Sequence, residues 1–245
     1  MKQGIFIIKE NTALTKTVYR MVLEGDTSEI TVSGQFVNLL LDGFYLRRPI
    51  SVCDRVDGQL TIVYKVVGKG TEKMSRMQAG ESVDILTGLG NGYDLTDAGE
   101  HPLLLGGGVG VPPMYLLAKD LIAMGKQVSV ILGFNTKDEV FYEDEFRALG
   151  ADVTVATADG SYGVKGFVTD AMKDIDYTYF YTCGPEPMLK AVWNASKTGG
   201  QFSFEERMGC GFGACMGCSC KTITGYKRIC KEGPVMQKEE ILWKS

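Results

Sequence analysis

The hydrophobic positions of the first hundred residues fall in short runs that are rich in β-branched and aromatic residues. Turns built on Gly, Asp and Asn separate these runs, and this spacing is typical of a small antiparallel barrel. Residues 5–8 predict a first strand, and we expect a short helix from Thr71 to about Gln78 with Thr71 as its N-cap. The other predicted strands are TKTVYRMVLEG, ITVSGQFVNLLL, RRPISVCDRV and QLTIVYKVVG.

The pattern changes near His101, where buried-strand runs and helical periodicity begin to alternate. The strand runs are HPLLLGGG, QVSVILGF and ADVTVAT, the helical ones are VPPMYLLAKDLIAMG, VFYEDEFRALG and FVTDAMKDI, and YTYFYTCGPEPMLKAVWNASKTG is a strand, turn and helix. This alternation predicts an open parallel α/β sheet. Periodicity fades after Gln201. We therefore expect a β-barrel at 1–100, an α/β domain at 101–205 and a cysteine-rich C-terminal loop at 206–245.

Composition narrows the class of protein. An apolar content of 44% and a charged content of 23% are ordinary for a soluble globular chain. The net charge of −4 argues against a nucleic-acid partner, and no run of Lys and Arg suggests binding to an anionic membrane. The first apolar run is too short for a signal peptide, and no stretch reaches the ~18 apolar residues of a membrane span. We expect a cytoplasmic chain with reduced thiols.

Five of the seven cysteines lie in one glycine-rich stretch, CGFGACMGCSC followed by KTITGYKRIC. Four of them follow the spacing C-x4-C-x2-C…C, which is the plant-type pattern of [2Fe–2S] ligands. The predicted ligands are Cys210, Cys215, Cys218 and Cys230. Cys220 lies too close to Cys218 to close the ring easily, so we interpret it as a spare thiol.

The same stretch makes a further prediction and leaves alternatives open. Gly211, Gly213 and Gly217 are expected to supply the positive φ angles with which a loop turns its N–H groups toward cluster sulfurs. Zinc sites favour paired C-x2-C units, often with histidine, and the only histidine, His101, is distant in the sequence. An odd number of cysteines fits a disulfide framework poorly. A redox dithiol and simple packing are the remaining alternatives.

Two turns in the α/β half indicate a nucleotide site. Glycines between a buried strand and a helix let the backbone approach a phosphate at the helix N-terminus. A second turn ends a later strand, and ligands bind at the carboxyl edge of such sheets, so we expect both turns there. A purely structural glycine turn is the alternative, since prolines occupy the helix start and no acidic residue selects NAD over NADP. The turn residues are Gly106, Gly107, Gly108 and Gly110, and Cys183, Gly184 and Pro185.

The barrel half contains a third candidate, the stretch LRRPISVCD. The planar guanidinium of Arg48 suits a pyrophosphate, and Ser51 is a donor for a flavin ring nitrogen. The strand Val63–Tyr64–Lys65 is a candidate for contact with isoalloxazine or adenine. Gly70 and Thr71 open the short helix, whose N-terminus is a second phosphate site. A solvated arginine pair at a barrel edge is the alternative interpretation.

Taken in order, RRPIS, YKVVGKGT, LTGLGNGY, GGGVGVPPMYLL, CGPEPML and ERMGCGFGACMGCSC…YKRICKEGPV make the chain similar to one known family. It resembles the FAD-containing, iron–sulfur electron-transfer subunits of class 1B, NAD-linked dihydroorotate dehydrogenase, within the ferredoxin–NADP reductase superfamily. The resemblance covers essentially the whole chain. Its most specific part is the cysteine loop with the trailing CKEGPV.

The resemblance implies a function for each motif. Arg48, Pro49, Ile50, Ser51, Val63–Lys65, Gly70 and Thr71 would bind FAD; Gly106–Gly110 and Cys183–Pro185 would frame NAD(H); and the four cysteines would hold the cluster. Electrons would then pass between NAD(H) and an FMN-containing catalytic subunit, in a 2+2 heterotetramer, and dihydroorotate would react on that partner during pyrimidine synthesis. No acid–base pair for substrate chemistry is expected in this chain.

Three alternatives remain. One is the small subunit of another NAD(P)H:acceptor oxidoreductase, of the ferredoxin:NADP transhydrogenase type, which would share the fold and the FAD site. The second is a metal-sensing or redox-sensing regulator that holds a cluster without turnover. The third is a purely structural protein with a zinc loop.

Overall fold

The computed structural model describes residues 1–243, and its N-terminal part is a closed six-stranded antiparallel barrel. The strands follow the order β1-β2-β5-β4-β3-β6, and the interior is filled by buried aliphatic and aromatic side chains such as Phe6, Met21 and Ile62. The elements are β1 (Lys2–Ala13), β2 (Val18–Glu24), β3 (Phe36–Leu40), β4 (Arg48–Val56), β5 (Gln59–Lys65), α1 (Lys69–Arg76) and β6 (Ser82–Leu89).

Helix α1 begins two residues earlier than predicted. Gly68 in extended conformation is the N-cap, and Thr71 occupies the third helical position, so the prediction of Thr71 as N-cap is wrong. The Thr71 hydroxyl reaches back instead: it accepts from the N–H of Val67 at 2.9 Å and donates to the carbonyl of Gly68 at 3.1 Å. The hydroxyl thereby closes the turn that leads from β5 into the helix.

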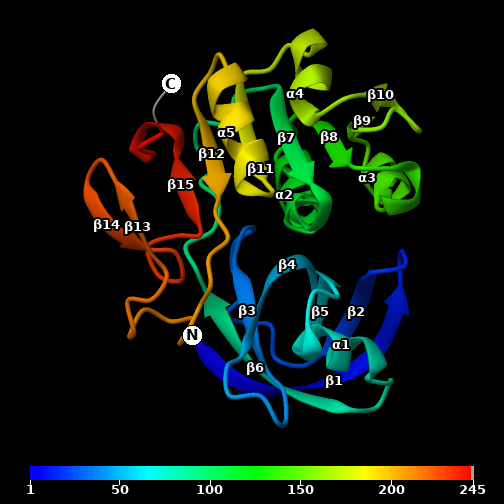
Figure 1. Cartoon of the computed structure of the whole chain (residues 1–245), viewed down its shortest axis with the longest axis vertical. Helices are drawn as coiled ribbons and strands as arrows, with labels where there is room; N and C mark the ends of the chain where they lie inside the picture. Colours follow the sequence, from blue (N-terminus) through cyan, green and yellow to red (C-terminus); the bar gives the residue numbers. More distant parts are fainter. Residues whose placement is uncertain (244–245) are drawn as a thin grey trace.

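The second part is a seven-stranded sheet in the order β10-β9-β8-β7-β11-β12-β15. Strands β7 to β12 are parallel, as predicted, and β15 pairs antiparallel with β12. Figure 1 shows the sheet and its helices above the barrel. The strands are β7 (Pro102–Gly107), β8 (Ser129–Phe134), β9 (Asp152–Thr157), β10 (Val164–Lys165), β11 (Tyr179–Cys183), β12 (Gly200–Ser203) and β15 (Val235–Gln237).

The helices of this part follow the strands, but two are shorter than the sequence pattern predicts. Helix α3 starts only after Tyr142, which adopts a left-handed conformation (φ 68°) that costs about 1–2 kcal/mol. This kink lets both Phe141 and Tyr142 be buried in the core. The helices are α2 (Val111–Ala123), α3 (Glu143–Ala148), α4 (Val168–Ala171) and α5 (Glu186–Ala195), with 3-10 turns at η1 (Gly108–Gly110), η2 (Lys137–Glu139), η3 (Met172–Asp174) and η4 (Lys238–Glu240).

The cysteine-rich segment lies between β12 and β15, the last two strands at one edge of the sheet. It carries the hairpin of β13 (Ser219–Thr222) and β14 (Gly225–Arg228), and the chain then returns to the sheet as β15 (Figure 1). A bridge between Thr222 and Ile241 ties the hairpin to the residues that follow β15. The cysteine loop is therefore anchored on both sides.

Contacts between the two halves set the position of the strand ends above the barrel. Helix α2 packs on β4, and Lys119 pairs with Asp54 across the boundary at 2.6 Å. Within residues 1–243, no helix is long and apolar enough to cross a membrane.

Candidate functional site

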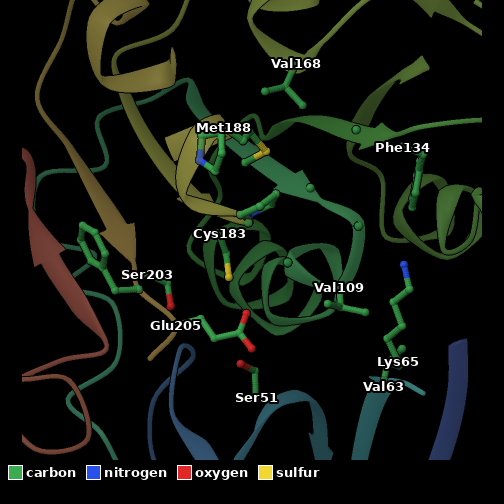
Figure 2. Close-up of a pocket in the computed structure, with 18 of the residues that line it drawn as sticks. Ser51, Val63, Lys65, Val109, Phe134, Val168, Cys183, Met188, Ser203 and Glu205 are labelled. Carbon is green, nitrogen blue, oxygen red and sulfur yellow. The ribbon is translucent and has the colours of Figure 1, made fainter. Parts of the chain in front are cut away.

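A cavity of about 660 Å³ lies where the barrel, the parallel sheet and the segment after β12 meet. Figure 2 shows side chains from all three parts pointing into it. Most of the residues that the sequence nominated for cofactors line this one space. They are Pro49, Ile50, Ser51, Val63, Tyr64 and Lys65 from the barrel, and Gly107, Gly108, Gly110, Cys183, Gly184 and Pro185 from the sheet.

The two predicted turns meet at the carboxyl edge of the sheet. Strands β7 and β11 are neighbours, with Cys183 opposite Gly106 in the register. A Cβ added to Gly110 would lie 2.2 Å from the carbonyl oxygen of Cys183, so the two turns are in direct contact. Gly106 does not line the cavity; a Cβ there would lie 2.8 Å from Cα of Val111, so its role is to bring strand and helix together.

Three further nominated residues, Arg48, Gly70 and Thr71, lie outside the cavity wall. Arg48 and Gly70 touch each other, because a Cβ on Gly70 would lie 2.2 Å from Nε of Arg48. The guanidinium also stacks over the ring of Phe44, with Cζ 4.8 Å from the ring centroid. The start of α1 and the Arg48 guanidinium therefore form a cationic subsite, and this chemistry fits the phosphates of a dinucleotide cofactor.

The cavity also contains residues that the sequence reasoning missed. Part of its wall comes from the end of β8, the loop after it and the first turns of α4 and α5. The other part comes from β3, from the end of β12 and the segment after it, and from the loop before β15. The rule that ligands bind at the carboxyl edge of a parallel sheet is the signal that could have found the first group. The missed residues include Gly133, Phe134, Asn135, Glu139, Val168 and Met188 in the first group, and Phe36, Ser203, Phe204, Glu205, Met208 and Pro234 in the second.

Four polar side chains converge near the middle of the cavity, where Figure 2 shows Ser51, Cys183, Ser203 and Glu205 facing one another. Burial raises the pKa of the Cys183 thiol to about 12, and the nearby Glu205 carboxylate adds to this effect. Cys183 therefore stays a neutral thiol. Since no second cysteine of residues 1–243 lines the cavity, this position does not form a redox dithiol.

The predicted cluster cysteines come in two pairs. The Sγ atoms of Cys218 and Cys230 lie 3.2 Å apart, and the Cys230 N–H donates to Sγ of Cys218 at 3.4 Å. On the other side, Sγ of Cys210 accepts from the N–H groups of Ala214 at 3.2 Å and Cys215 at 3.4 Å. The Cys210 N–H in turn donates to Sγ of Cys215 at 3.5 Å.

The two cysteine pairs differ in the pKa of their thiols, because only the first pair contains a thiol with several N–H donors. Burial disfavours ionisation of Cys210, but N–H groups of Phe212, Cys215 and Ala214 outweigh it and lower the thiol pKa to about 6. For Cys230, burial and the neighbouring Cys218 raise the thiol pKa to about 12. The loop thus presents N–H donors to sulfur, as a cluster site requires.

This arrangement fits the two irons of a [2Fe–2S] cluster. Each iron of a [2Fe–2S] cluster takes two thiolates, which matches sulfurs in two pairs. Gly211 and Gly213 have the predicted positive φ angles, 78° and 95°. The prediction for Gly217 is wrong: Met216 has the left-handed conformation (φ 61°) instead.

An arginine links the two halves of the cysteine site. Arg228 lies on β14, two residues before Cys230, and its guanidinium donates to the carbonyl of Gly213 at 2.6 Å. Its Nε also donates to Glu232 at 2.9 Å. Arg228 therefore holds the loop with the first ligands against the hairpin with the last one.

The cysteine site adjoins the cavity on one side and the exterior on the other. Cys218 and Cys230 are buried in a cluster that includes Phe36 and is packed by Met208, and these two residues also line the cavity. Cys215, by contrast, is exposed. A group held by the cysteines would thus lie between the cavity and the molecular surface.

Comparison with known proteins gives matches to two parts of the chain. A family model described as the iron–sulfur cluster binding domain of dihydroorotate dehydrogenase B matches residues 205–242. A second, described as an oxidoreductase NAD-binding domain, matches residues 104–194. Among solved structures, the NADH-dependent reduced ferredoxin-NADP oxidoreductase has a TM-score of 0.89 and 30% identity, over 98% of this chain and 90% of that one.

A ferredoxin NADP+ reductase from Neisseria gonorrhoeae, solved with bound FAD and NADP, shares the fold at a TM-score of 0.70 and 17% identity, over 80% of this chain and 90% of that one. Curated relatives are more similar in sequence. The dihydroorotate dehydrogenase B (NAD(+)) electron transfer subunit of Fusobacterium nucleatum subsp. nucleatum is 44% identical over 96% of both chains, and that of Shouchella clausii is 42% identical over 98% of both. The chain therefore belongs to the family of dihydroorotate dehydrogenase B (NAD(+)) electron transfer subunits.

Proposed function

We propose that this chain carries electrons between NAD(H) and the catalytic subunit of dihydroorotate dehydrogenase, through FAD in the cavity and a [2Fe–2S] cluster on its four paired cysteines. One observation carries the proposal. The cavity is lined by the barrel motifs, by both turns of the sheet and by Phe36 and Met208, which pack against buried Cys218 and Cys230. The two redox sites therefore share a wall.

The bound groups supply the electron chemistry, since a flavin exchanges hydride with a nicotinamide and single electrons with a cluster. The chain's residues position them. Arg48 and the start of α1 hold the FAD phosphates, and Pro49–Ser51 with Val63 line the space for its ring. The glycine turn and Cys183–Pro185 frame the nicotinamide nucleotide. No side-chain acid–base step is needed, because the dihydroorotate chemistry lies on the partner.

The same assignment divides the chain by cofactor. We assign FAD to residues 1–100, NAD(H) to 101–205 and the cluster to 206–245, although β15 completes the sheet of the middle part. A cytoplasmic location accords with seven cysteines that form no disulfide with one another.

The partner is an FMN-containing catalytic subunit in a 2+2 heterotetramer, and electrons leave through the exposed side of the cysteine loop. Phe212 and Met216 are 44% and 53% exposed there. The loop touches β3 of the barrel, because Asn38 donates to the Cys210 carbonyl at 3.4 Å. Two residues further along β3, Leu40 lies opposite Asp84 of β6, and Ile5 of β1 lies opposite Asp84 on its other side. Leu40 and Ile5 are also exposed. We define Ile5, Leu40, Phe212 and Met216 as the cluster face and propose it as the docking surface.

Trp243, near the C-terminus, is a second candidate for docking. The indole of Trp243 packs edge-on against Phe202 with ring centroids 5.6 Å apart, so much of it serves the core. We therefore assign docking to the cluster face first.

The decisive experiment co-expresses the chain with the dihydroorotate-oxidising subunit. A complex of two copies of each, which reduces NAD+ with dihydroorotate, is the expected result. Phe212→Glu should abolish the complex but keep NADH-driven reduction of a dye. Met124→Glu changes an apolar residue after α2 that is at least as exposed as Phe212; it is the control and should assemble normally. A complex that survives Phe212→Glu would exclude the cluster face.

A second candidate rests on the structural similarity to the NADH-dependent reduced ferredoxin-NADP oxidoreductase. Reduced ferredoxin would then replace dihydroorotate as the electron donor. Assaying each donor with the purified chain and its co-expressed partner separates the two functions.

A further inference from the structure

Alternate residues of strand β3 point to opposite sides of the barrel wall. Val37 and Leu39 are fully buried in the core of the barrel. Side chains alternate along a strand, so Phe36, Asn38 and Leu40 point out of the barrel. Leu40 is 37% exposed, whereas Phe36 and Asn38 are only 3% and 1% exposed. A segment from outside the barrel therefore covers this part of its outer surface.

The covering segment is the cysteine-rich one. Phe36 belongs to the same cluster of buried side chains as Cys218 and Cys230. Two residues further along β3, Nδ2 of Asn38 donates to the carbonyl of Cys210 at 3.4 Å. One barrel strand thus contacts both cysteine pairs through neighbouring positions of a single face.

Among residues 1–243, the side chain of Asn38 makes no hydrogen bond to the barrel itself. Its one hydrogen bond there leads to Cys210, and its Oδ1 is buried without a partner. A buried amide costs free energy unless its hydrogen bonds are regained. An apolar residue would therefore serve the barrel better, and the amide is explained by its contact with the cysteine loop.

This contact is made to the peptide that follows the first cysteine ligand. A Cβ added to Gly211 would lie 2.3 Å from Nδ2 of Asn38, so the side chain and this peptide touch. Gly211 has φ 78°, and glycine changes between backbone conformations at little cost. A peptide is planar, so a bond to the Cys210 carbonyl fixes the orientation of the whole unit. The N–H groups of Ala214 and Cys215, which donate to Sγ of Cys210, follow a few residues later.

Asn38 is itself held in place by Arg47, the neighbour of the arginine assigned to FAD. The backbone carbonyl of Asn38 accepts from Nη1 of Arg47 at 3.2 Å. The same nitrogen donates to Oδ1 of Asp84 on β6 at 2.8 Å. Arg47 thereby ties β3 to β6 at the position of Asn38.

We propose that Asn38 is a positioning residue for the iron–sulfur cluster, and that its amide holds the Cys210 loop so that backbone N–H groups reach the Cys210 sulfur. The inference rests on the proposed function and extends the cluster site to a strand of the FAD barrel. N–H donors to sulfur stabilise the extra negative charge of a reduced cluster, and partners behind the ligands increase metal affinity. Without the amide, the loop should lose iron faster and hold a cluster of lower reduction potential.

The test compares Asn38→Leu and Asn38→Asp with the natural chain, each purified anaerobically with FAD and cluster. Leucine removes the amide, and an ionised aspartate keeps its shape but has no N–H to donate. Iron release to a chelator should be about tenfold faster in both variants. The EPR g values of the reduced cluster should shift, and redox titration should give a lower potential. FAD content should not change. Either variant is sufficient if the other does not fold.

The matched control is Gln35→Leu, which removes another buried amide of the barrel. Gln35 is 7% exposed, and its side chain bonds the backbone of Thr31, Val32 and Gly90. Equal changes in Gln35→Leu would show a general loosening of the barrel and overturn the assignment. Natural iron release and a natural EPR signal in the Asn38 variants would also overturn it. A natural chain that binds no iron and sulfide would instead refute the proposed function itself.

Discussion

At the scale of single residues, the five clustered cysteines divide into two groups by the contacts that their sulfurs make. Four of them meet in two pairs through sulfur contacts and N–H donors. Cys220 lies on β13 opposite Lys227, where burial raises its thiol pKa. The sequence spacing predicted this division, because Cys220 is only two residues after Cys218.

This division predicts different outcomes for two serine variants. Cys230→Ser should lose most of its iron, since it removes one of four thiolate ligands. Cys220→Ser should keep two irons and two sulfides per chain. Iron and acid-labile sulfide analysis after anaerobic purification measures both. Equal iron loss in the two variants would mean that Cys220 is a ligand.

Glu139 makes a second residue-level prediction, about the choice of dinucleotide. The carboxylate lines the cavity just beyond the end of β8, where Oε2 accepts from the N–H of Asn135 at 3.2 Å and its Nδ2 at 2.8 Å. A carboxylate held in this way accepts hydrogen bonds from ribose hydroxyls and repels a 2′-phosphate. We expect Glu139→Gln to reduce the preference for NADH over NADPH by about tenfold in kcat/KM. Asp138→Asn, its neighbour outside the lining, is the control; an unchanged preference in Glu139→Gln would contradict the role.

At the scale of elements, the sequence predicted the existence of strands and helices better than their ends. Hydrophobic periodicity is local, so the barrel strands and the alternating sheet could be predicted from it. The start of α1 depended on the back-bonding of the Thr71 hydroxyl, and that of α3 on a left-handed Tyr142. The pairing of β15 with β12 joins residues over thirty positions apart in the chain, which no local pattern encodes.

The close contact between Arg48 on β4 and Gly70 on α1 predicts that FAD binding depends on this glycine. Gly70→Ala would place a Cβ 2.2 Å from Nε of Arg48 and displace the guanidinium from the helix start. We expect FAD affinity to fall by about tenfold or more through loss of this charge-assisted contact. Gly68→Ala, in the same loop, meets nothing within 4 Å and should keep FAD. Fluorescence titration of the apoprotein with FAD compares the two, and equal FAD affinity would contradict the subsite.

At the scale of the whole molecule, the sequence predicted most of the motifs that line the cavity but not how the cavity is closed. The glycine and Cys-Gly-Pro turns were placed correctly by the rule for parallel sheets. Phe36, Glu205 and Met208 could not be predicted, because Phe36 enters the cavity from β3 and the other two from the segment after β12, and only packing between domains brings these parts together. Lys65 likewise lines the cavity because the sheet packs above the barrel. That packing depends on contacts between the two halves, such as the ion pair of Lys119 with Asp54.

Phe36 and Met208 lie between the cavity and the cysteine site, so the two sites are adjacent but distinct. We therefore predict that a mutation can abolish electron transfer through the cluster while leaving flavin reduction by NADH intact. In Cys230→Ser, β12, β15 and the barrel strands that frame the cavity keep their own pairing, so NADH should still bleach the bound flavin within about threefold of the natural rate. Electron transfer to the catalytic subunit should fall by at least about a hundredfold, because the carrier on the exposed side is gone. Stopped-flow absorbance follows the first step and dihydroorotate-dependent NAD+ reduction the second, with Cys220→Ser as the control for both. If flavin bleaching were lost together with transfer, the cysteine loop would be holding the cavity in shape, and the separation of the two sites would be refuted.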